Sequence, residues 1–275
     1  MSRSYLRGRS RMGLTARLVI LLVIIAFGFI KFLSTTKVVM NPYTGEQQRI
    51  ALTPQQEAQL GLQSVSKMIQ QGGGQHPDAQ AQATVDRVGA KLVANVNRLA
   101  RHGEPIPYPF EFHLLGDENM INAFALPGGQ IFITAALYKN LKNEDQLAGV
   151  LGHEVGHVVA KHSNEQMSKS GLLASIGTGI GVAVGGDSGV GTQQVASMVN
   201  QVLSTRYGRE DEYESDRIGA WLMYHAGYNP RELLGVLEIL KESAKGPRPP
   251  EMLSTHPHPE NRIGKIKELL DQMPK

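Results

Sequence analysis

The sequence feature that most constrains the fold is a His-Glu-x-x-His string at residues 153–157. On a helix, positions i and i+4 lie on the same face, so His153 and His157 can bind one zinc ion while Glu154 points at a metal-bound water. The apolar residues around the string recur at helical spacing, as in a buried helix. They are Leu147, Val150, Leu151, Val155 and Val158. The string therefore predicts a buried helix that carries a metal site.

The start and end of this helix can also be predicted. Asn143 is followed by Gln146 at the spacing of a capping box, which favours a helix that begins at Glu144. We expect the helix to end near His162. Because His162 is five residues past His157, the helical rotation turns it away from the ligand face, and we expect no functional role for it.

Zinc hydrolases need a third protein ligand, and the chain has no cysteine to supply it. The strongest candidate is Glu212, which lies in the acidic stretch 209–217 at i, i+4 spacing from Asp216. On a second helix, Glu212 can bind the metal while Asp216 accepts the outer N–H of a ligand histidine. The alternative is a solvated helix face with ion pairs such as Glu210 with Arg217. Behind a His-Glu-x-x-His helix we favour the metal site.

Two further blocks complete a family pattern. Residues 122–129 read Asn-Ala-Phe-Ala-Leu-Pro-Gly-Gly, and residues 254–257 read Ser-Thr-His-Pro. Together with the two blocks above, they resemble the gluzincin zinc metalloproteases of the HtpX and BepA type, a family that includes the CAAX prenyl endopeptidases and mitochondrial Oma-type proteases. The resemblance covers roughly residues 50–270. One departure is Ser215, where the family usually has alanine.

The resemblance implies a role for each residue of the two main blocks. His153, His157 and Glu212 would hold one Zn²⁺ per chain, and Glu154 would be the catalytic general base. The physical chemistry agrees, because zinc lowers the pKa of its bound water and a carboxylate can take the proton during attack on a peptide carbonyl. We therefore expect a zinc metalloendopeptidase.

Residues 122–126 and 130–134 read as two short extended runs joined by the tight turn at Pro127-Gly128-Gly129. The resemblance implies that Asn122, Ala123 and Phe124 bind protein or peptide substrates in extended form. Pairing with an edge strand supplies affinity through main-chain hydrogen bonds and demands little of the substrate's sequence. The alternative is an ordinary hairpin with no role in binding.

His256 lies in a proline-rich stretch between Pro247 and Pro259. A histidine beside proline in a loop is usually exposed to solvent. The resemblance instead implies a catalytic position near the metal, where His256 either donates to the tetrahedral oxyanion or occupies the open coordination site as an inhibitory latch. His258 is a weaker competitor for these roles.

The amino terminus carries an apolar run that predicts a membrane anchor. Residues 18–30 are thirteen consecutive apolar residues. Residues 14–33 extend the run to twenty, about 30 Å of helix at 1.5 Å per residue, enough to cross a bilayer. A cleaved signal peptide or a mitochondrial presequence is the alternative. However, no small-x-small cleavage site follows Ile30, and the run is apolar all round rather than amphipathic.

Charge sets the predicted topology. Five arginines lie in residues 1–17, and no acidic residue precedes Glu46. By the positive-inside rule, the N-terminus stays in the cytoplasm and the rest is exported. This predicts a single-pass protein of the bacterial inner membrane, with membrane lipid as a partner of the anchor and a periplasmic catalytic domain. Without those arginines, 23 basic residues face 25 acidic ones, about −2 net, so we expect no nucleic-acid partner.

We expect four regions: a basic cytoplasmic tail (1–17), a transmembrane signal anchor (18–33), a polar connector (34–52) and a zinc metallopeptidase domain (53–273). The expected fold class is α+β and mostly α-helical, a gluzincin domain with a small β-sheet or hairpin beside the His-Glu-x-x-His helix. The remaining expected elements are a helix from a Thr53/Gln56 capping box to the glycines at 72–74, a helix through Val85 to about Arg101, a strand over 108–115, and helices near 231–242 and 259–272.

Residues 171–191 contain eight glycines among apolar residues, which fits neither a regular helix nor a solvated loop. A mobile lid, a lipid-facing patch, a partner surface and a buried helical hairpin all stay open.

Two functions follow. The first is a membrane-anchored zinc endopeptidase acting on misfolded or unassembled envelope proteins, where the substrate is implied by the resemblance alone. The alternative is a membrane-tethered chaperone or binding module with a latched or structural metal site. The sequence identifies no other protein partner.

Overall fold

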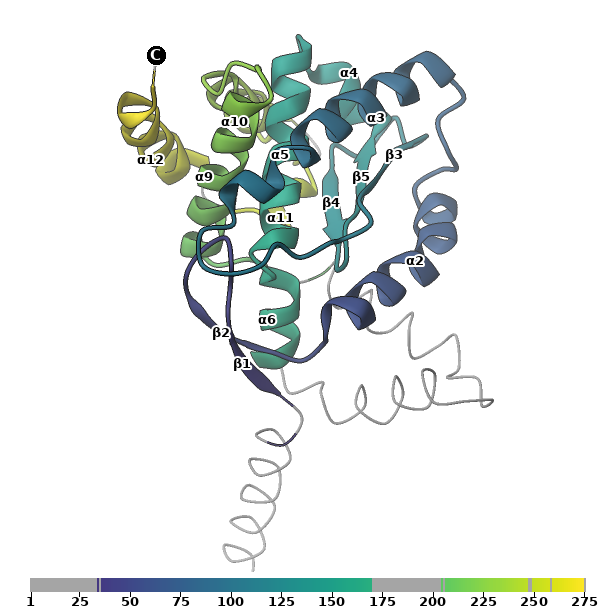
Figure 1. Ribbon diagram of the computed structural model, residues 1–275. Coiled ribbons are helices and arrows are strands. Elements are labelled where there is room, and N and C mark those ends of the chain that lie inside the picture. Colours follow the sequence, from purple (N-terminus) through teal and green to yellow (C-terminus); the bar gives the residue numbers. More distant parts are fainter. Residues whose placement is uncertain are drawn as a thin grey trace, which may run out of the picture.

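The computed structural model describes residues 36–169, 206–246, 249–257 and 259–274, together with residues 34 and 204 (Figure 1). It is mostly helical with two small sheets, which confirms the expected secondary-structure content. None of the helices in these ranges is long and apolar enough to cross a bilayer. The predicted anchor at 18–33, the glycine-rich stretch 171–191 and His258 lie outside the described residues.

Two helices at the centre of the domain bring the two sequence blocks together. They are α5 (Glu144–Val159) and α9 (Arg209–His225), which pack along one another (Figure 1). A Cβ added to Gly152 would lie 3.3 Å from the backbone of Gly219, and one added to Gly156 would lie 2.8 Å from the carbonyl oxygen of Ser215. Side chains at these two α5 positions would force the helix axes apart. The glycines therefore let the His-Glu-x-x-His string approach the acidic block.

The predicted cap of α5 forms in part. The Asn143 side chain accepts the N–H of Gln146 at 2.8 Å, as expected. The Gln146 side chain accepts the N–H of Lys142, also at 2.8 Å, rather than that of the cap residue. At the other end, α5 stops at Val159, earlier than the predicted His162.

The break after α5 lies at Lys161, which is the one non-glycine residue with positive φ, 60°, among the described residues. A new helix, α6 (His162–Lys169), starts directly after it. Left-handed backbone is unfavourable for a residue with a Cβ, so tertiary contacts must hold it. This break explains why α5 ends at Val159 and not near His162, as predicted.

Three strands form the sheet beside α5. They are β3 (Glu111–Leu115), β4 (Ala123–Leu126) and β5 (Gln130–Thr134), in the order β3-β5-β4. β4 and β5 form the predicted antiparallel hairpin, and Gly128 and Gly129 adopt positive φ of 85° and 103° in its turn. β3 pairs in parallel with β5, and β4 is left as an edge strand that packs on α5.

The predicted polar connector instead contains a hairpin of β1 (Lys37–Met40) and β2 (Gln47–Ile50). Asn41 donates from Nδ2 to the carbonyl of Val159 at 2.9 Å, and Gln48 donates from Nε2 to the carbonyl of Ala160 at 2.7 Å. These bonds satisfy carbonyls that the end of α5 leaves without helical partners. Part of the predicted connector is therefore an ordered hairpin that caps α5.

The helices predicted near 231–242 and 259–272 agree with α10 (Glu232–Ser243) and α12 (Pro259–Gln272), whereas α4 (Ala135–Asn140) and α11 (Met252–Thr255) were not predicted. The Thr53/Gln56 capping box forms as expected, and the helix it begins ends at Gln71, before the glycines at 72–74. The predicted helix to Arg101 divides into a helix and a 3-10 turn. The remaining elements are α2 (Pro54–Gln71), α3 (Ala79–Val93) and η1 (Val96–Leu99).

A buried ion pair holds the break at Lys161. Its ammonium donates to Glu57 Oε2 at 2.6 Å and contacts the hydroxyl of Tyr108, which itself donates to Glu57 Oε2 at 2.6 Å. Lys161 is 3% exposed and Glu57 2%. The triad joins α2, the segment before β3 and the junction of α5 with α6. Burial raises the pKa of Tyr108, and Glu57 raises it further, so the phenol keeps its proton and remains a donor.

We expect Lys161→Met to lower the free energy of unfolding by about 3–5 kcal/mol, because it leaves the Glu57 carboxylate buried without its cation. The matched control is Lys169→Met, which removes an exposed pair with Glu165 at 3.1 Å and should cost less than about 1 kcal/mol. Denaturant unfolding of both variants measures the difference. Equal losses would show that the triad does not stabilise the junction.

Candidate metal centre

Four buried side chains from three parts of the chain point at one spot. His153 and His157 come from α5, Glu212 from α9, and His256 follows α11. The Nε2 atoms of His153 and His157 lie 3.1 Å apart, and Glu212 Oε1 lies 3.4 Å from His157 Nε2. His256 Nδ1 lies 3.1 Å from Glu212 Oε1 and 3.3 Å from His153 Nε2. Each residue is at most 1% exposed.

These separations fit the ligand shell of one zinc ion. A tetrahedral site with bonds of about 2.0–2.1 Å has ligand atoms roughly 3.3–3.4 Å apart. The distances above lie on both sides of that value. Imidazole nitrogen and carboxylate oxygen are also donors that zinc prefers. In the described part of the chain, no other group of three or more such residues converges in this way.

Asp216 meets the outer nitrogen of His153, with 2.9 Å between Oδ1 and Nδ1. A carboxylate in this position fixes which ring nitrogen of His153 carries the proton, so that Nε2 is free to bind a metal. Burial alone would raise the pKa of Asp216, but the neighbouring Arg262 guanidinium holds it below its usual value. Asp216 therefore stays ionised and can accept the histidine proton.

Arg262 was not anticipated from the sequence. Its Nε and Nη2 donate to the two oxygens of Asp216 at 2.8 and 2.6 Å, and its Nη1 lies 2.7 Å from Glu212 Oε2. Burial would raise the pKa of Glu212, yet Arg262 and then His256 bring it well below its usual value. The missed signal is that Arg262 shares the buried stripe of α12 with Ile266 and Leu270.

His162 does not join the ligand cluster, as predicted, but it contacts the outer ring nitrogen of a ligand histidine, which the sequence did not suggest. Because the chain breaks at Lys161, His162 folds back, and its Nδ1 lies 2.9 Å from the Nδ1 of His157. Because Nε2 of His157 faces the cluster, the proton of the His157 ring lies on Nδ1 and is donated to His162 Nδ1. The Nε2–H of His162 then donates to Glu214 Oε2 at 3.2 Å. Burial sets the pKa of His157 well below its usual value, so its ring is neutral, as a metal ligand must be.

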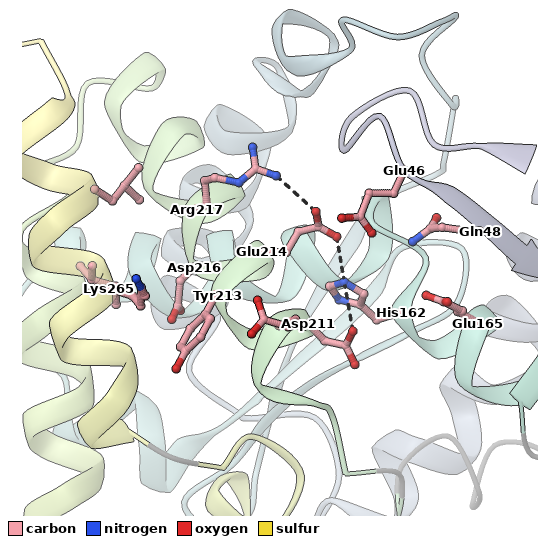
Figure 2. A pocket seen from close by; sticks show the side chains of 13 residues that line it. Glu46, Gln48, His162, Glu165, Asp211, Tyr213, Glu214, Asp216, Arg217 and Lys265 are labelled. Carbon is pink, nitrogen blue, oxygen red and sulfur yellow. Dashed lines mark hydrogen bonds and ion pairs between the residues drawn. The ribbon is translucent and has the colours of Figure 1, made fainter.

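Figure 2 shows the contact of His162 with Glu214. Both residues line a cavity of about 340 Å³. Glu214 lies between His162 and Arg217, and the distance from Arg217 Nη2 to Glu214 Oε1 is 3.2 Å. The ion pair expected between Glu210 and Arg217 is therefore replaced by Glu214 with Arg217. The solvated face proposed for α9 exists, but Glu212 and Asp216 lie on its buried side.

Tyr207 is a second residue that the sequence did not reveal. Its ring stacks on His157 with 4.0 Å between centroids and 28° between planes. Its hydroxyl shares a hydrogen bond with Ser163 Oγ at 2.8 Å. An aromatic ring on one face of the imidazole limits how far the ligand can rotate. No spacing along the chain pointed to this residue.

Glu154 lies beside the cluster without binding it. The side chain is 1% exposed, and its Oε1 makes no hydrogen bond to any described residue. The nearest basic group is His256, whose Nε2 lies 3.8 Å from that oxygen. Burial lowers the pKa of His256, but the Glu212 and Glu154 carboxylates raise it above its usual value overall. Glu154 thus offers a carboxylate oxygen with no hydrogen-bond donor among the described residues.

His256 is buried, at 1% exposed, and is not the exposed loop histidine of the alternative interpretation. The segment that carries it is anchored by a hydrogen bond from Met252 N–H to the carbonyl of Ile121, at 3.4 Å, directly before β4. Of the predicted substrate-binding residues, Ala123 is buried against the core shared with α5, whereas Asn122 and Phe124 are partly exposed on the opposite face.

The fold and the site define a metallopeptidase of the gluzincin type, with two histidines on one helix and a glutamate on a second. The chain belongs to peptidase family M48, whose family model matches residues 79–270. The resemblance seen in the motifs is therefore confirmed.

Individual relatives agree with this assignment. The chain is similar to the beta-barrel assembly-enhancing protease of Escherichia coli strain K12, with 33% identity over 187 residues, covering 64% of this chain and 37% of the relative. It is also similar to the mitochondrial metalloendopeptidase OMA1 of Saccharomyces cerevisiae, with 31% identity over 172 residues, covering 58% of this chain and 47% of the relative. The matches thus span less than half the length of these two relatives.

We expect His162→Ala to weaken zinc binding by about 10–100-fold, because loss of a group that orients a ligand histidine typically costs that much. The matched control is His102→Ala, an exposed histidine outside the site, which should leave zinc affinity unchanged. Competition with a chromophoric chelator measures both affinities. If His162→Ala binds zinc as tightly as the wild type, His162 does not orient His157.

Proposed function

We propose that the protein is a membrane-anchored, zinc-dependent endopeptidase. The observation that carries the proposal is the convergence of His153, His157 and Glu212 on one point, with the free carboxylate oxygen of Glu154 beside them. The three ligands would hold one zinc ion, which fits their spacing and their donor atoms. Membership of a peptidase family supports hydrolysis of peptide bonds as the reaction.

A bound zinc ion would supply Lewis-acid chemistry that activates water at neutral pH. The chain's own residues would do the rest. Glu154 takes the proton of the attacking water and returns it to the leaving amine. Asp216 and His162 keep the two ligand histidines in the correct tautomer. Arg262 offsets the negative charge of Glu212 and Asp216, so both carboxylates stay ionised although they are buried.

His256 occupies the fourth corner of the cluster in this conformation. Catalytic zinc sites keep one position open for water or substrate, whereas structural sites are closed by four protein ligands. We therefore propose that His256 acts as a latch that must leave before substrate is hydrolysed. Its position also fits the other expected role, donation to the oxyanion, once the ring has moved. The two roles are separated by the effect of removing it.

The substrate would be protein in extended form. β4 is an edge strand beside α5, so its free backbone groups can pair with a peptide along Asn122, Ala123 and Phe124. Main-chain pairing demands little of sequence, which suits misfolded or unassembled envelope proteins. The name of one relative, beta-barrel assembly-enhancing protease, supports an envelope role.

We propose that residues 18–33 anchor the chain in the bacterial inner membrane, with the tail at 1–17 in the cytoplasm and the catalytic domain in the periplasm. The apolar run and the arginine bias support this topology. The β1–β2 hairpin belongs with the catalytic domain, because it caps α5. The connector between membrane and domain is then shorter than residues 34–52.

A second candidate is a membrane-tethered chaperone or binding module with a latched or structural metal. Closure of the cluster by His256 is the observation that favours it. Such a module would retain zinc and bind unfolded protein, but would cleave nothing in either the wild-type or a latch-free form.

Glu154→Gln should reduce hydrolysis of casein by about 10²–10⁴-fold, the usual contribution of a general base, while zinc content stays at one ion per chain. His153→Ala should lose both zinc and activity. Cleavage assays and metal analysis of the full-length proteins measure the two effects. Casein hydrolysis by Glu154→Gln at the wild-type rate would exclude the proposed mechanism.

His256→Ala should raise kcat/KM for casein about tenfold, the effect of removing a closed state favoured by about 1.4 kcal/mol. Zinc must remain bound for the comparison to count, and metal analysis checks this. A large fall in kcat with zinc retained would instead assign His256 to stabilisation of the oxyanion.

A further inference from the structure

A cavity of about 280 Å³ lies against the edge strand β4. Apolar side chains from α2, β3, β4 and the loop before β4 line it, namely Met68, Leu115, Phe124 and Met120. It differs from the acidic cavity behind His162 in its lining and its place, because it lies where a peptide paired with β4 would run. Nothing in the proposed mechanism uses it.

We propose that this cavity, the side-chain pocket, binds one lysine or arginine side chain of the substrate and so sets a sequence preference. The inference rests on the proposed function, because it requires a peptide that pairs with β4. It adds to that function a chemical class of preferred residue.

The alternation of β4 determines which substrate side chains can reach the pocket. Ala123 and Ala125 belong to the hydrophobic core that includes α5, whereas Phe124 packs against the smaller core to which α2 contributes Leu60 and Met68. Asn122 and Phe124 line the pocket. Because successive side chains of a strand point to opposite faces, a peptide paired with β4 sends every second side chain to this face. At most one of those side chains fits a cavity of this size.

The polar groups of the pocket favour a cation. Its lining includes the carboxylates of Asp117 and Glu251 and no lysine, arginine or histidine. Asn122 also lines the pocket, and its Oδ1 atom is buried and accepts no hydrogen bond from any described residue. Asp117 Oδ1 already accepts the N–H groups of Asn119 and Met120, and Glu251 Oε1 accepts the hydroxyl of Ser254. A carboxylate has further lone pairs, so both can still accept a hydrogen bond from an incoming cation.

Lysine and arginine match both halves of the pocket. Their methylene stems can pack against Met68, Leu115 and Phe124, while their charged ends reach acceptors that already carry negative charge. A glutamate side chain would bring a third carboxylate to the same place, which is unfavourable at close range. The pocket therefore selects for positive charge and against negative charge.

The test measures peptide binding without turnover. Full-length protein carrying Glu154→Gln and His256→Ala is titrated with fluorescent extended peptides that differ only in a lysine, methionine or glutamate at one position, scanned along the peptide. At one position, lysine should bind about tenfold more tightly than glutamate, with methionine between them, as expected for one charge-assisted hydrogen bond. Equal affinities at every position, or tightest binding of methionine, would overturn the proposal.

Charge variants then locate the effect. In the same background, Glu251→Lys should abolish or reverse the lysine preference, and the isosteric Asp117→Asn should weaken it. The matched control is Glu238→Lys, which makes the same charge change on the exposed side of α10 and should leave the preference intact. If Glu238→Lys reduces the preference as much as Glu251→Lys does, the preference comes from the overall charge of the protein and not from the pocket.

Cleavage distinguishes failure of this inference from failure of the proposed function. The full-length wild type and His256→Ala are incubated with a peptide library, and cut sites are mapped by mass spectrometry. Cutting with no charge preference at any position would overturn the pocket and leave the endopeptidase intact. Absence of cutting by both proteins would overturn the endopeptidase, and the binding measurement would still decide the pocket.

Discussion

The close approach of α5 to α9 is the contact on which the rest of the structure depends. At Gly152 and Gly156, the backbone of one helix lies against the backbone of the other, with no side chain between them. This contact sets the histidines of one helix against the acidic residues of the second, and it explains why the cluster is almost fully buried. Charged groups at such depth are stable only when each has a partner, and Arg262 provides one for both Glu212 and Asp216. The ends of α5 are equally determined, by the cap at Asn143 and by the hairpin that binds its last carbonyls.

Features that depend on neighbours in the sequence could be predicted. The apolar period of α5 gave the helix and its buried face, and the run-turn-run pattern from Asn122 to Thr134 gave the hairpin. The i, i+4 spacing of Glu212 and Asp216 placed both on the buried side of one helix, where the structure brings them to the two α5 histidines. Each of these depends on local periodicity or turn chemistry, which a single sequence carries.

Features that depend on distant contacts could not be predicted. A lysine with positive φ gives no local signal, because Glu57 and Tyr108 hold it from far along the chain. The resulting break sets His162 against the outer nitrogen of His157, a contact that helical geometry did not suggest. The sequence of β1 and β2 predicts only a connector, because the hairpin is held by hydrogen bonds to carbonyls at the end of α5, more than 100 residues along the chain. Arg262 was hidden for a related reason, since a charge on an apolar stripe is meaningful only when its buried partner is known.

The central claim is that His153, His157 and Glu212 bind one zinc ion at the junction of α5 and α9. Diffraction from crystals of the full-length, zinc-loaded protein, collected on both sides of the zinc absorption edge, tests it most directly. We predict a single anomalous peak bonded to the Nε2 atoms of both histidines and to a carboxylate oxygen of Glu212, at about 2.0–2.2 Å. A zinc peak elsewhere, or a zinc-loaded crystal with Glu212 outside bonding distance of the ion, would contradict the account.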